Sequence, residues 1–590
     1  MREVVLISGH LCTGKSGLAR ALNKEFGYAL VKTSEVLTPL DRQVDRKALR
    51  AFAAQLDQET QGQWVFKAVR EFAGSLPADA PIVVDNIQTR EQLEYFRGHA
   101  EFHVTHVHLY ALAEELLRRY TKKCGSGAAV CQDVFAAADC IKDESDIEFF
   151  KRDADARIYV GRTDTRDNLV RVAARLGLYP PPDVRCVDVI VGGQFGSEGK
   201  GHIAAYLARD YDILVRVGGP NAGHSVSSAS GVYVYHQLPS GTKDTDARVL
   251  LGPGMTLNVD RLVQEIQDCG IGPDRLFIDP QVMIIEEADL ERERALVSSI
   301  ASTGRGGGAA AARRIMGRQP GLVRLARDIQ VLKPFVGAGP DYRGSTTVQL
   351  EQAYRQGLSV LLEGTQGSGL SLYHGQYPYV TSRDTNVAGC LAEAGISPSR
   401  VRRILMVIRP TPIRVGNPDA VLPDVAAIEG VGRPEQGSQE PRHSGELKHE
   451  TTFEEVAKQA GLDPRELLFH EKTSTTKRDR RVGWFDWEQF RKACALNAPS
   501  DIVLTFADYL SSENQNARRF EQLKLDTIKF IEEIERVAHA PVSLINTRFV
   551  RTGEGRLDRR SVIDRRNWVT RKQANAMSLK SRSRSEGSRD

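Results

Sequence analysis

The sequence lacks the features of a membrane, secreted or nucleic-acid-binding protein. Its 590 residues contain no apolar run near the roughly 18 residues of a membrane-spanning helix, which excludes such a helix. Residues 1–7 enter a predicted strand directly, without the apolar core and cleavage site of a signal peptide. The 80 lysines and arginines nearly balance 76 acidic residues, so the net charge of +4 creates no broad field for nucleic acid. We expect a cytoplasmic protein with neither membrane nor nucleic-acid partners.

Cysteine is scarce as well. Of the 8 cysteines, only Cys124, Cys131 and Cys140 lie near one another, and their spacing fits neither a zinc site nor a disulfide framework. We expect ordinary reduced thiols there and no bound metal.

Two α/β domains are predicted from the alternation of strands and helices. In residues 1–178, strands at 4–8, 82–85 and 104–110 alternate with helices at 17–26, 91–97 and 113–120. This order favours a small parallel sheet with helices on both faces. A proline-rich linker at 179–185 then leads to a larger α/β domain at 186–570, as a chain of this length requires more than one core.

Two segments of the second half are predicted to be irregular. Residues 430–447 combine glycine, proline and charges, which indicates a mobile surface loop, and Thr452 begins a helix behind it. Residues 571–590 are rich in serine, arginine and lysine and nearly lack apolar side chains. We expect them to form a disordered basic tail that is solvated and does not serve as a nucleic-acid arm.

A first glycine-rich loop, residues 9–16, matches the pattern G-x-x-x-x-G-K-[ST] and lies between a predicted strand and helix. In such P-loops the backbone amides, here from Gly9 to Gly14, and a lysine, here Lys15, bind the phosphates of a nucleoside triphosphate. Ser16 would bind Mg²⁺, and Asp85, at the end of a buried strand, would support it. The sequence therefore predicts a P-loop NTPase domain.

This first domain resembles the nucleoside and nucleotide kinase branch of P-loop proteins, with Arg118 and Arg119 placed like lid arginines. The resemblance implies phosphoryl transfer to a nucleotide but leaves the acceptor open. A regulatory NTP-binding module is the alternative interpretation.

Two more glycine-rich loops follow strands of the second domain. Residues 192–201 connect a strand at 187–191 to a helix at 203–209 and carry Lys200, a second arrangement suited to phosphate. Residues 218–225 follow a strand at 213–217 and carry His224. A histidine beside a phosphate loop can act as a general acid or stabilise charge on a transferred phosphoryl group.

These two loops, G-x-E-G-K-G followed by N-A-G-H-S, resemble the adenylosuccinate synthetase family. Further motifs appear in the family's order at 236–241, 302–306, 363–367, 377–382, 414–416 and 475–484, so that the resemblance covers about 186–560. It implies a ligase that joins L-aspartate to C6 of a purine nucleoside 5′-monophosphate. The 6-oxygen first accepts the γ-phosphoryl group of an NTP, and the aspartate amine then displaces phosphate.

The resemblance also implies residue roles. The catalytic residues would be Ser197, Lys200, His224 and Gln366. The monophosphate would be bound by Asn221, Ala222, Thr303, Arg318, Gln366 and Thr381, with Arg318, or Arg314, reaching the monophosphate of a neighbouring subunit in a homodimer. L-Aspartate would be bound by Thr475, Thr476, Arg478 and Arg480. The NTP would be bound by Gly196, Glu198, Gly199, Lys200, Gly201 and Asp508. Ser197 and the Gly223 carbonyl would contact Mg²⁺.

Ser197 departs from the family, which has at this place an aspartate that takes the N1 proton of IMP and touches Mg²⁺. A seryl hydroxyl is no general base unless another group deprotonates it. Serine at this place resembles the phage 2-aminoadenylosuccinate synthetases, which act on dGMP, and the shorter side chain leaves room for the 2-amino group. We therefore predict a guanine monophosphate, dGMP first, as the acceptor. The alternatives are an IMP-using enzyme with an altered mechanism and a nucleotide sensor with a degenerate ligase half.

The NTP base pocket departs as well. The family's Thr-Lys-x-Asp appears as residues 505–508, with Phe506 in place of the lysine, and its Ser-Thr-Gly-Pro appears as residues 546–549, Asn-Thr-Arg-Phe. These changes favour ATP over the family's GTP as co-substrate.

Overall fold

The computed structural model describes residues 1–37, 46–124, 144–228, 231–336, 344–417, 444–472, 479–548 and 561–586. The chain divides into two compact units, Met1–Pro180 and Pro181–Asp590, and the division falls inside the proline-rich segment. No helix in the described part of the chain is long and apolar enough to cross a membrane. Each unit is described by itself below.

The first unit is built on a parallel five-stranded sheet in the order β2-β3-β1-β4-β5. Its strands are β1 (Arg2–Gly9), β2 (Ala29–Val31), β3 (Ile82–Val84), β4 (Phe102–Tyr110) and β5 (Ala156–Tyr159). Its helices are α1 (Lys15–Phe26), α2 (Thr33–Val36), α3 (Arg46–Thr60), α4 (Gln63–Gly74), α5 (Arg90–Arg97), α6 (Ala113–Cys124), α8 (Glu144–Asp153) and α9 (Thr165–Arg175).

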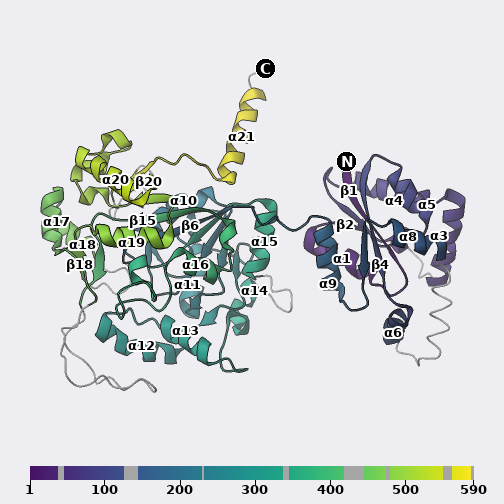
Figure 1. Cartoon of the computed structure of the whole chain (residues 1–590), viewed down its shortest axis with the longest axis horizontal. Coiled ribbons are helices and arrows are strands. Elements are labelled where there is room, and N and C mark those ends of the chain that lie inside the picture. The colour runs from purple at the N-terminus through teal and green to yellow at the C-terminus, as the bar shows by residue number, and fades with distance from the viewer. Residues whose placement is uncertain are drawn as a thin grey trace. The chain divides into compact units, whose positions relative to one another are not determined.

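Alternating residues of β1 show how the helices cover both faces of this sheet. Val5 and Ile7 belong to a core shared with α1 and α9, whereas Val4 and Leu6 belong to a core shared with α3, α4, α5 and α8 (Figure 1). Successive side chains of a strand point to opposite faces, so a strand buried on both sides is apolar throughout. The predicted two-sided α/β fold of the first domain is confirmed.

The second unit contains a nine-stranded sheet in the order β12-β10-β7-β14-β6-β15-β19-β20-β21. All neighbouring strands are parallel except β20 and β21. The strands are β6 (Val187–Gly192), β7 (Ile213–Arg216), β10 (Arg248–Leu251), β12 (Leu276–Ile278), β14 (Val360–Glu363), β15 (Val401–Ile408), β19 (Asp501–Leu504), β20 (Val542–Asn546) and β21 (Val562–Asp564).

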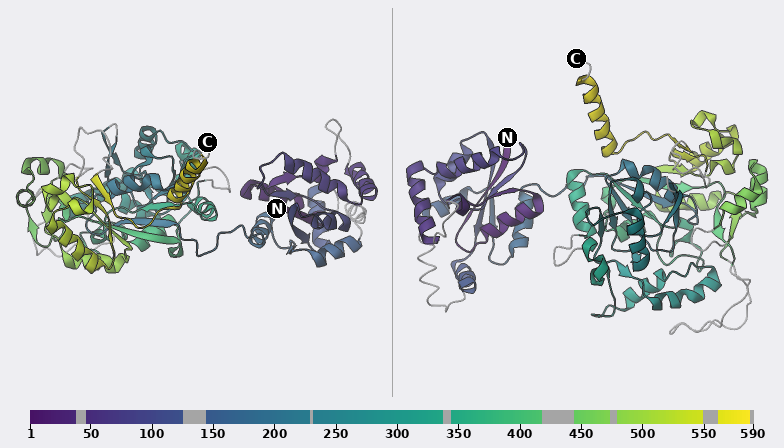
Figure 2. Two further views of the ribbon diagram at one scale, coloured as in Figure 1. Left: turned by 90° about the horizontal axis from the view of Figure 1, so that it is seen from above. Right: turned by 180° about the vertical axis from the view of Figure 1, so that it is seen from behind.

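Helices cover both faces of this sheet too (Figure 2). The helix α10 (Lys200–Leu207) packs on one face, against side chains such as Ile190 and Leu405. The other face, which carries Val189 and Val191, is covered by α15 (Thr346–Gln356), α16 (Val387–Ala394), α19 (Trp487–Asn497) and α20 (Leu525–Ala538). The predicted larger α/β domain is therefore also confirmed.

Smaller elements surround the sheet. Short ladders are formed by β8 (His224–Ser228) with β9 (Gly231–Tyr235), by β11 (Thr256–Leu257) with β13 (Met283–Ile284), and by β16 (Ile413–Val415), β18 (Arg480–Gly483) and β17 (Glu450–Thr451). The remaining α-helices before the C-terminal segment are α11 (Val259–Cys269), α12 (Glu287–Ile300), α13 (Gly307–Met316), α14 (Lys333–Val336), α17 (Phe453–Ala460) and α18 (Pro464–His470). Thr452 caps α17 as predicted, accepting the Glu455 N–H at 3.2 Å.

The prediction of a disordered tail at 571–590 is wrong for α21 (Arg571–Glu586). Thr570 starts this helix, since its hydroxyl accepts the Gln573 N–H at 3.1 Å while the Gln573 side chain accepts the Thr570 N–H at 2.9 Å. A reciprocal cap of this kind stabilises a helix start without apolar residues, which composition alone does not reveal. The predicted loop at 430–447 falls mostly outside the described residues, as do Cys131, Cys140 and the side chain of Cys124.

Candidate active site

A pocket of about 770 Å³ lies in the second unit, walled by loops that follow five adjacent strands, β7, β14, β6, β15 and β19. Parallel neighbours end at the same edge of a sheet, so loops from distant parts of the sequence meet there. The wall includes the predicted residues Gly196, Ser197, Gly199, Lys200, Gly201, Asn221, Ala222, Gly223, His224, Thr303, Gln366, Thr381 and Arg480.

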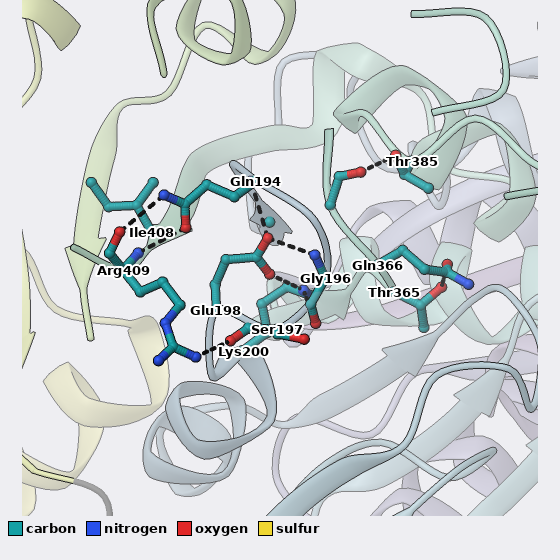
Figure 3. A network of polar contacts seen from close by, with 12 residues as sticks. Gln194, Gly196, Ser197, Glu198, Lys200, Thr365, Gln366, Thr385, Ile408 and Arg409 are labelled. Carbon is teal, nitrogen blue, oxygen red and sulfur yellow. Dashed lines mark hydrogen bonds and ion pairs between the residues drawn. The ribbon is translucent and has the colours of Figure 1, made fainter. Parts of the chain in front are cut away.

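The loop after β6 is folded around the fully buried carboxylate of Glu198 (Figure 3). Its Oε1 accepts the N–H groups of Gln194 at 3.0 Å and Gly196 at 2.7 Å, and its Oε2 accepts from Lys200 Nζ at 2.7 Å. Gly199, in the left-handed region at φ 78°, caps α10. Glu198 does not line the pocket, so the structure gives it an internal role, whereas Gly196, Gly199, Lys200 and Gly201 of the same loop do line it.

Ser197 lines the pocket, and its backbone carbonyl is held from behind by Arg409, whose Nη1 donates to it at 3.1 Å. Arg409 is buried over the rings of Phe506, at 4.0 Å, and Tyr509, at 5.0 Å. The same guanidinium donates to Glu471 Oε1 at 2.7 Å. The Ser197 loop is therefore fixed by a cation that stacks on aromatic rings.

Glu471 joins this network to the strand that carries the predicted aspartate-binding motif. Its carboxylate accepts from Arg480 Nη1 at 2.7 Å and from the Tyr509 hydroxyl at 2.6 Å. Burial by itself raises the pKa of Glu471, but Arg409 and Arg480 overcome it and lower that pKa to about 2. Sequence reasoning missed Arg409 and Glu471 because neither belongs to a recognised loop motif.

His224 is oriented by a carboxylate. Its Nδ1 lies 2.5 Å from Glu363 Oε1 and 3.0 Å from Arg216 Nη1, which is ion-paired with the same Oε1 at 3.1 Å; Glu363 Oε2 accepts the Ser240 N–H at 2.7 Å. The contact with the carboxylate, which can only accept, is shorter than the contact with the guanidinium, so we assign the proton to Nδ1. The buried Nε2, for which the described residues offer no hydrogen-bond partner, belongs to a side chain that lines the pocket.

The charges around His224 favour a neutral imidazole and an ionised carboxylate. Burial, followed by Arg216, lowers the pKa of His224 to about 4, and Glu363 opposes the shift. For Glu363, burial raises the pKa, but Arg216 and His224 together lower it to about 2. At neutral pH, Nε2 therefore presents a lone pair until an anionic phosphate raises the pKa of the imidazole and a proton binds.

Several residues that were predicted to bind the monophosphate line the same pocket. Gln366, in the left-handed region at φ 57°, donates from Nε2 to Thr381 Oγ1 at 3.4 Å. Asn221 and Thr303 line the same pocket, and the buried Asn221 Oδ1 has no hydrogen-bond partner among the described residues. A buried amide oxygen without a partner suits a site that a ligand completes.

Some predicted residues are not brought to this pocket. Thr475, Thr476 and Arg478 lie outside the described residues. Arg318 is exposed and Asp508 is buried, and neither lines the pocket, although Phe506 and Tyr509 beside Asp508 do. Arg314 donates to the carbonyls of Pro253, at 3.1 Å, and Gln281, at 2.7 Å. Burial raises the pKa of Asp508 to about 7, which makes it a carboxyl group that can be protonated near neutrality.

The donors available to Mg²⁺ in this pocket are neutral. The described residues contain no cluster of three or more histidine, cysteine, aspartate or glutamate side chains suited to a metal. The nearby carboxylates, which are Glu198, Glu363 and the pocket-lining Glu471, are already held by their own partners. The Ser197 hydroxyl and the Gly223 carbonyl fit an ion that arrives on NTP phosphates, since Mg²⁺ commonly binds through substrate oxygens and water.

In the first unit, the P-loop residues contact one another and Asp85. Lys15 Nζ donates to the carbonyls of Gly9 and His10, both at 2.9 Å. The Ser16 hydroxyl donates to Asp85 Oδ2 at 3.0 Å, and Asp85 Oδ1 accepts the Thr33 N–H at 3.1 Å. Gly14, at φ 93°, caps α1. A serine hydroxyl beside an aspartate is the donor pair that P-loops offer to Mg²⁺.

Comparison with known proteins identifies the family. The family model for adenylosuccinate synthetase matches residues 189–336 and 323–515. The adenylosuccinate synthetase of Methanococcus aeolicus is 33% identical over 369 residues, which cover 61% of this chain and 96% of that protein. The chain belongs to the adenylosuccinate synthetase family, whose members are ligases.

Solved structures were compared as well. The succinoaminodeoxyadenylate synthetase (PurZ) of cyanophage S-2L, bound to dGMP and to dATP as an energy donor, is 26% identical, with a TM-score of 0.48 and coverage of 68% of this chain and 99% of that one. A gluconokinase from Sinorhizobium meliloti is 17% identical, with a TM-score of 0.22 and coverage of 30% of this chain and 91% of that one.

The Glu363–His224 pair makes a testable prediction. Near pH 7, NTP binding should be accompanied by proton uptake at the neutral His224, because bound phosphates stabilise the imidazolium. Calorimetric titration in buffers of different ionisation enthalpy should show less uptake for His224→Asn than for the wild type. Glu363→Gln should lower kcat by about 100-fold, because the imidazolium loses its counter-charge. Equal proton uptake by wild type and His224→Asn would contradict this assignment.

Proposed function

We propose that the second unit condenses L-aspartate with C6 of a guanine nucleoside 5′-monophosphate, with dGMP preferred. The observation that carries this proposal is that Ser197, and not a carboxylate, lines the pocket beside the phosphate loop. The adjacent Glu198 cannot replace the missing acid, because its oxygens are held by two amides and Lys200. The wall at Ser197 thus carries no carboxylate, and the short seryl side chain leaves room for the 2-amino group that distinguishes guanine from hypoxanthine.

The reaction would proceed in two displacements. The purine O6 bonds to the γ-phosphorus as the bond to the bridging oxygen of the nucleoside diphosphate breaks, and the N1 proton of the purine passes to water. The aspartate nitrogen then bonds to C6, giving two protons of its ammonium form to water, and O6 leaves within inorganic phosphate. Mg²⁺, when bound with the NTP, would neutralise charge on the phosphates.

The residues of the pocket suit these steps. Lys200 and the loop amides would bind the phosphates, and His224 Nε2 would donate to the transferring group once protonated. The 5′-monophosphate would be held by Asn221, Thr303 and Thr381. Arg480, fixed by Glu471, would bind an aspartate carboxylate together with the predicted residues Thr475, Thr476 and Arg478.

We further propose ATP as the phosphoryl donor. Phe506 stands at the place of the family's lysine, and its ring lies between Arg409 and the pocket wall near Gly199. An apolar ring favours stacking of a base. A negatively charged carboxylate would favour guanine by accepting its N–H groups, but the pKa of Asp508 is raised to about 7, so this side chain is poorly suited to carry that charge.

For the first unit we propose a nucleotide kinase activity that acts on a nucleotide of the same route. Support comes from the P-loop geometry, in which Ser16 and Asp85 are paired and Lys15 lies against the loop. A homodimer is proposed as well, because the exposed Arg318 lies away from its own pocket, as expected for a residue that serves a neighbouring subunit.

The acceptor can be tested directly. Purified protein with ATP, Mg²⁺ and L-aspartate should release phosphate faster with dGMP or GMP than with IMP or dIMP. Ser197→Asp should move the ratio of kcat/KM toward IMP by at least about tenfold, because a carboxylate restores the base and fills the space for the 2-amino group. Ser197→Ala, which adds no carboxylate, is the control and should keep the guanine preference. Turnover with IMP alone would refute the proposal, and absence of turnover would favour a nucleotide sensor.

The donor preference depends on Phe506. With the best acceptor, KM for ATP should be lower than for GTP. Phe506→Lys should reverse this order by restoring a polar group near the base, whereas Phe506→Tyr should leave it unchanged. An unaltered ATP-to-GTP ratio in Phe506→Lys would exclude this residue as the determinant.

The two units can be separated by mutation. Lys15→Ala should abolish phosphoryl transfer or NTP binding by the first unit and leave aspartate-dependent phosphate release intact, because Lys15 belongs to a separate phosphate site. Lys200→Ala should have the opposite effect. Loss of both activities in either variant would indicate that the two sites are coupled.

A further inference from the structure

Arg383 and Glu393 form an ion pair behind the purine side of the pocket, and neither side chain lines it. Arg383 Nε and Nη2 donate to the two oxygens of Glu393 at 2.6 and 2.9 Å. The side chains are 12% and 18% exposed, so the pair is largely shielded from water. A two-point bond between a planar guanidinium and a carboxylate fixes direction as well as distance.

This pair joins two loops of the site. Glu393 Oε2 accepts the N–H of Gly218, at the start of the His224 loop, at 2.9 Å. Arg383 Nη1 donates to Thr365 Oγ1 at 2.9 Å and lies 3.4 Å from Gln366 Oε1. A Cβ at Gly218, which has φ +92°, would lie 2.2 Å from Thr365 Oγ1, so the two loops are in close contact.

These contacts determine which end of the Gln366 amide faces the pocket. An arginine can only donate, so the Gln366 atom next to Arg383 must be the amide oxygen. The Thr365 hydroxyl, whose oxygen already accepts from Arg383, donates to the same Oε1 at 2.8 Å. Both acceptor positions of Oε1 are thereby used. The Nε2 group, 3.4 Å from Thr381 Oγ1, is left to offer its N–H toward the bound nucleotide.

We infer that Arg383 is a positioning residue, which orients the Gln366 amide so that the pocket offers an N–H donor to a 6-oxo purine. This inference rests on the proposed function, with the pocket-lining Gln366 among the residues that contact the purine monophosphate, and it holds for hypoxanthine and guanine alike. The donor bonds to O6 of the substrate. A 6-amino purine presents its own N–H at the same place and is disfavoured, because two donors then oppose each other and one is left without a partner.

The orientation also bears on turnover. In the product, the 6-oxygen has been replaced by a secondary amine, whose N–H faces the same Gln366 donor. The contact that favours the substrate is thus lost in the product, which assists product release. Arg383 therefore contributes to discrimination without touching the nucleotide.

The test compares binding of 6-oxo and 6-amino purine monophosphates by calorimetry without NTP. The probes are GMP and IMP against AMP and 2-aminoadenosine 5′-monophosphate. Arg383→Met, which keeps length but has no donor, should let the amide rotate and reduce the 6-oxo preference by about tenfold. Arg383→Lys restores a donor and should recover most of that preference.

Two further variants separate orientation from folding. Glu393→Gln removes the negative charge of the pair but keeps an amide oxygen that accepts from Arg383 and holds it beside Gln366, so it should lower thermal stability with little change in the 6-oxo preference. Thr365→Val removes the second donor to Oε1 and should move the preference in the same direction as Arg383→Met. An unchanged ratio in Arg383→Met, or an equal change in Glu393→Gln, would overturn the inference. Failure of the wild type to bind any purine monophosphate would instead refute the proposed function.

Discussion

Buried carboxylates held by backbone amides and a cation shape the pocket. An ionised carboxylate costs several kcal/mol to remove from water unless hydrogen bonds and a positive charge compensate it. Glu198 meets this condition with two loop amides and Lys200. The same hydrogen bonds that stabilise the ionised carboxylate also fix the conformation of the loop after β6. They hold Lys200 in the position from which it lines the pocket. Glu363 and Glu393 repeat the arrangement, each with a backbone amide and an arginine, and Glu471 is held by two arginines and the Tyr509 hydroxyl.

This constraint has a chemical consequence. Every carboxylate that supports the described wall is already engaged, so the pocket presents donors and neutral acceptors to its ligands. Glu363 acts on the chemistry only through His224, and Glu471 acts through Arg409 and Arg480. A site of this kind is suited to bind phosphates and carboxylates. Its handling of protons depends on how ligand charge changes the pKa of His224.

Most of the fold was predictable, because each main strand is an apolar run followed by a glycine loop. Residues 4–8 and 187–191 indicated the strands that lead to the two phosphate loops, and the structure confirms both. The tail was mispredicted, because composition is blind to the reciprocal hydrogen bonds of Thr570 and Gln573. In the site, the residues of the glycine motifs were found, whereas Arg409, Glu471 and Arg383 were missed. These three residues act through contacts with side chains that are distant in the sequence, and no short sequence motif marks them.

The amino-acid sequence by itself determined the two phosphate loops, the family motifs and the presence of serine at position 197, because these depend on neighbouring residues and local turns. Tertiary structure decided what each charged group does. His224 and Glu363 are 139 positions apart, yet their contact selects the tautomer that turns Nε2 to the pocket. The role of Glu198 likewise changes from ligand-binding to loop-folding once its partners are known. Burial and contacts between distant residues determine these protonation states and side-chain orientations. Burial and such contacts depend in turn on tertiary packing, which the linear sequence does not display.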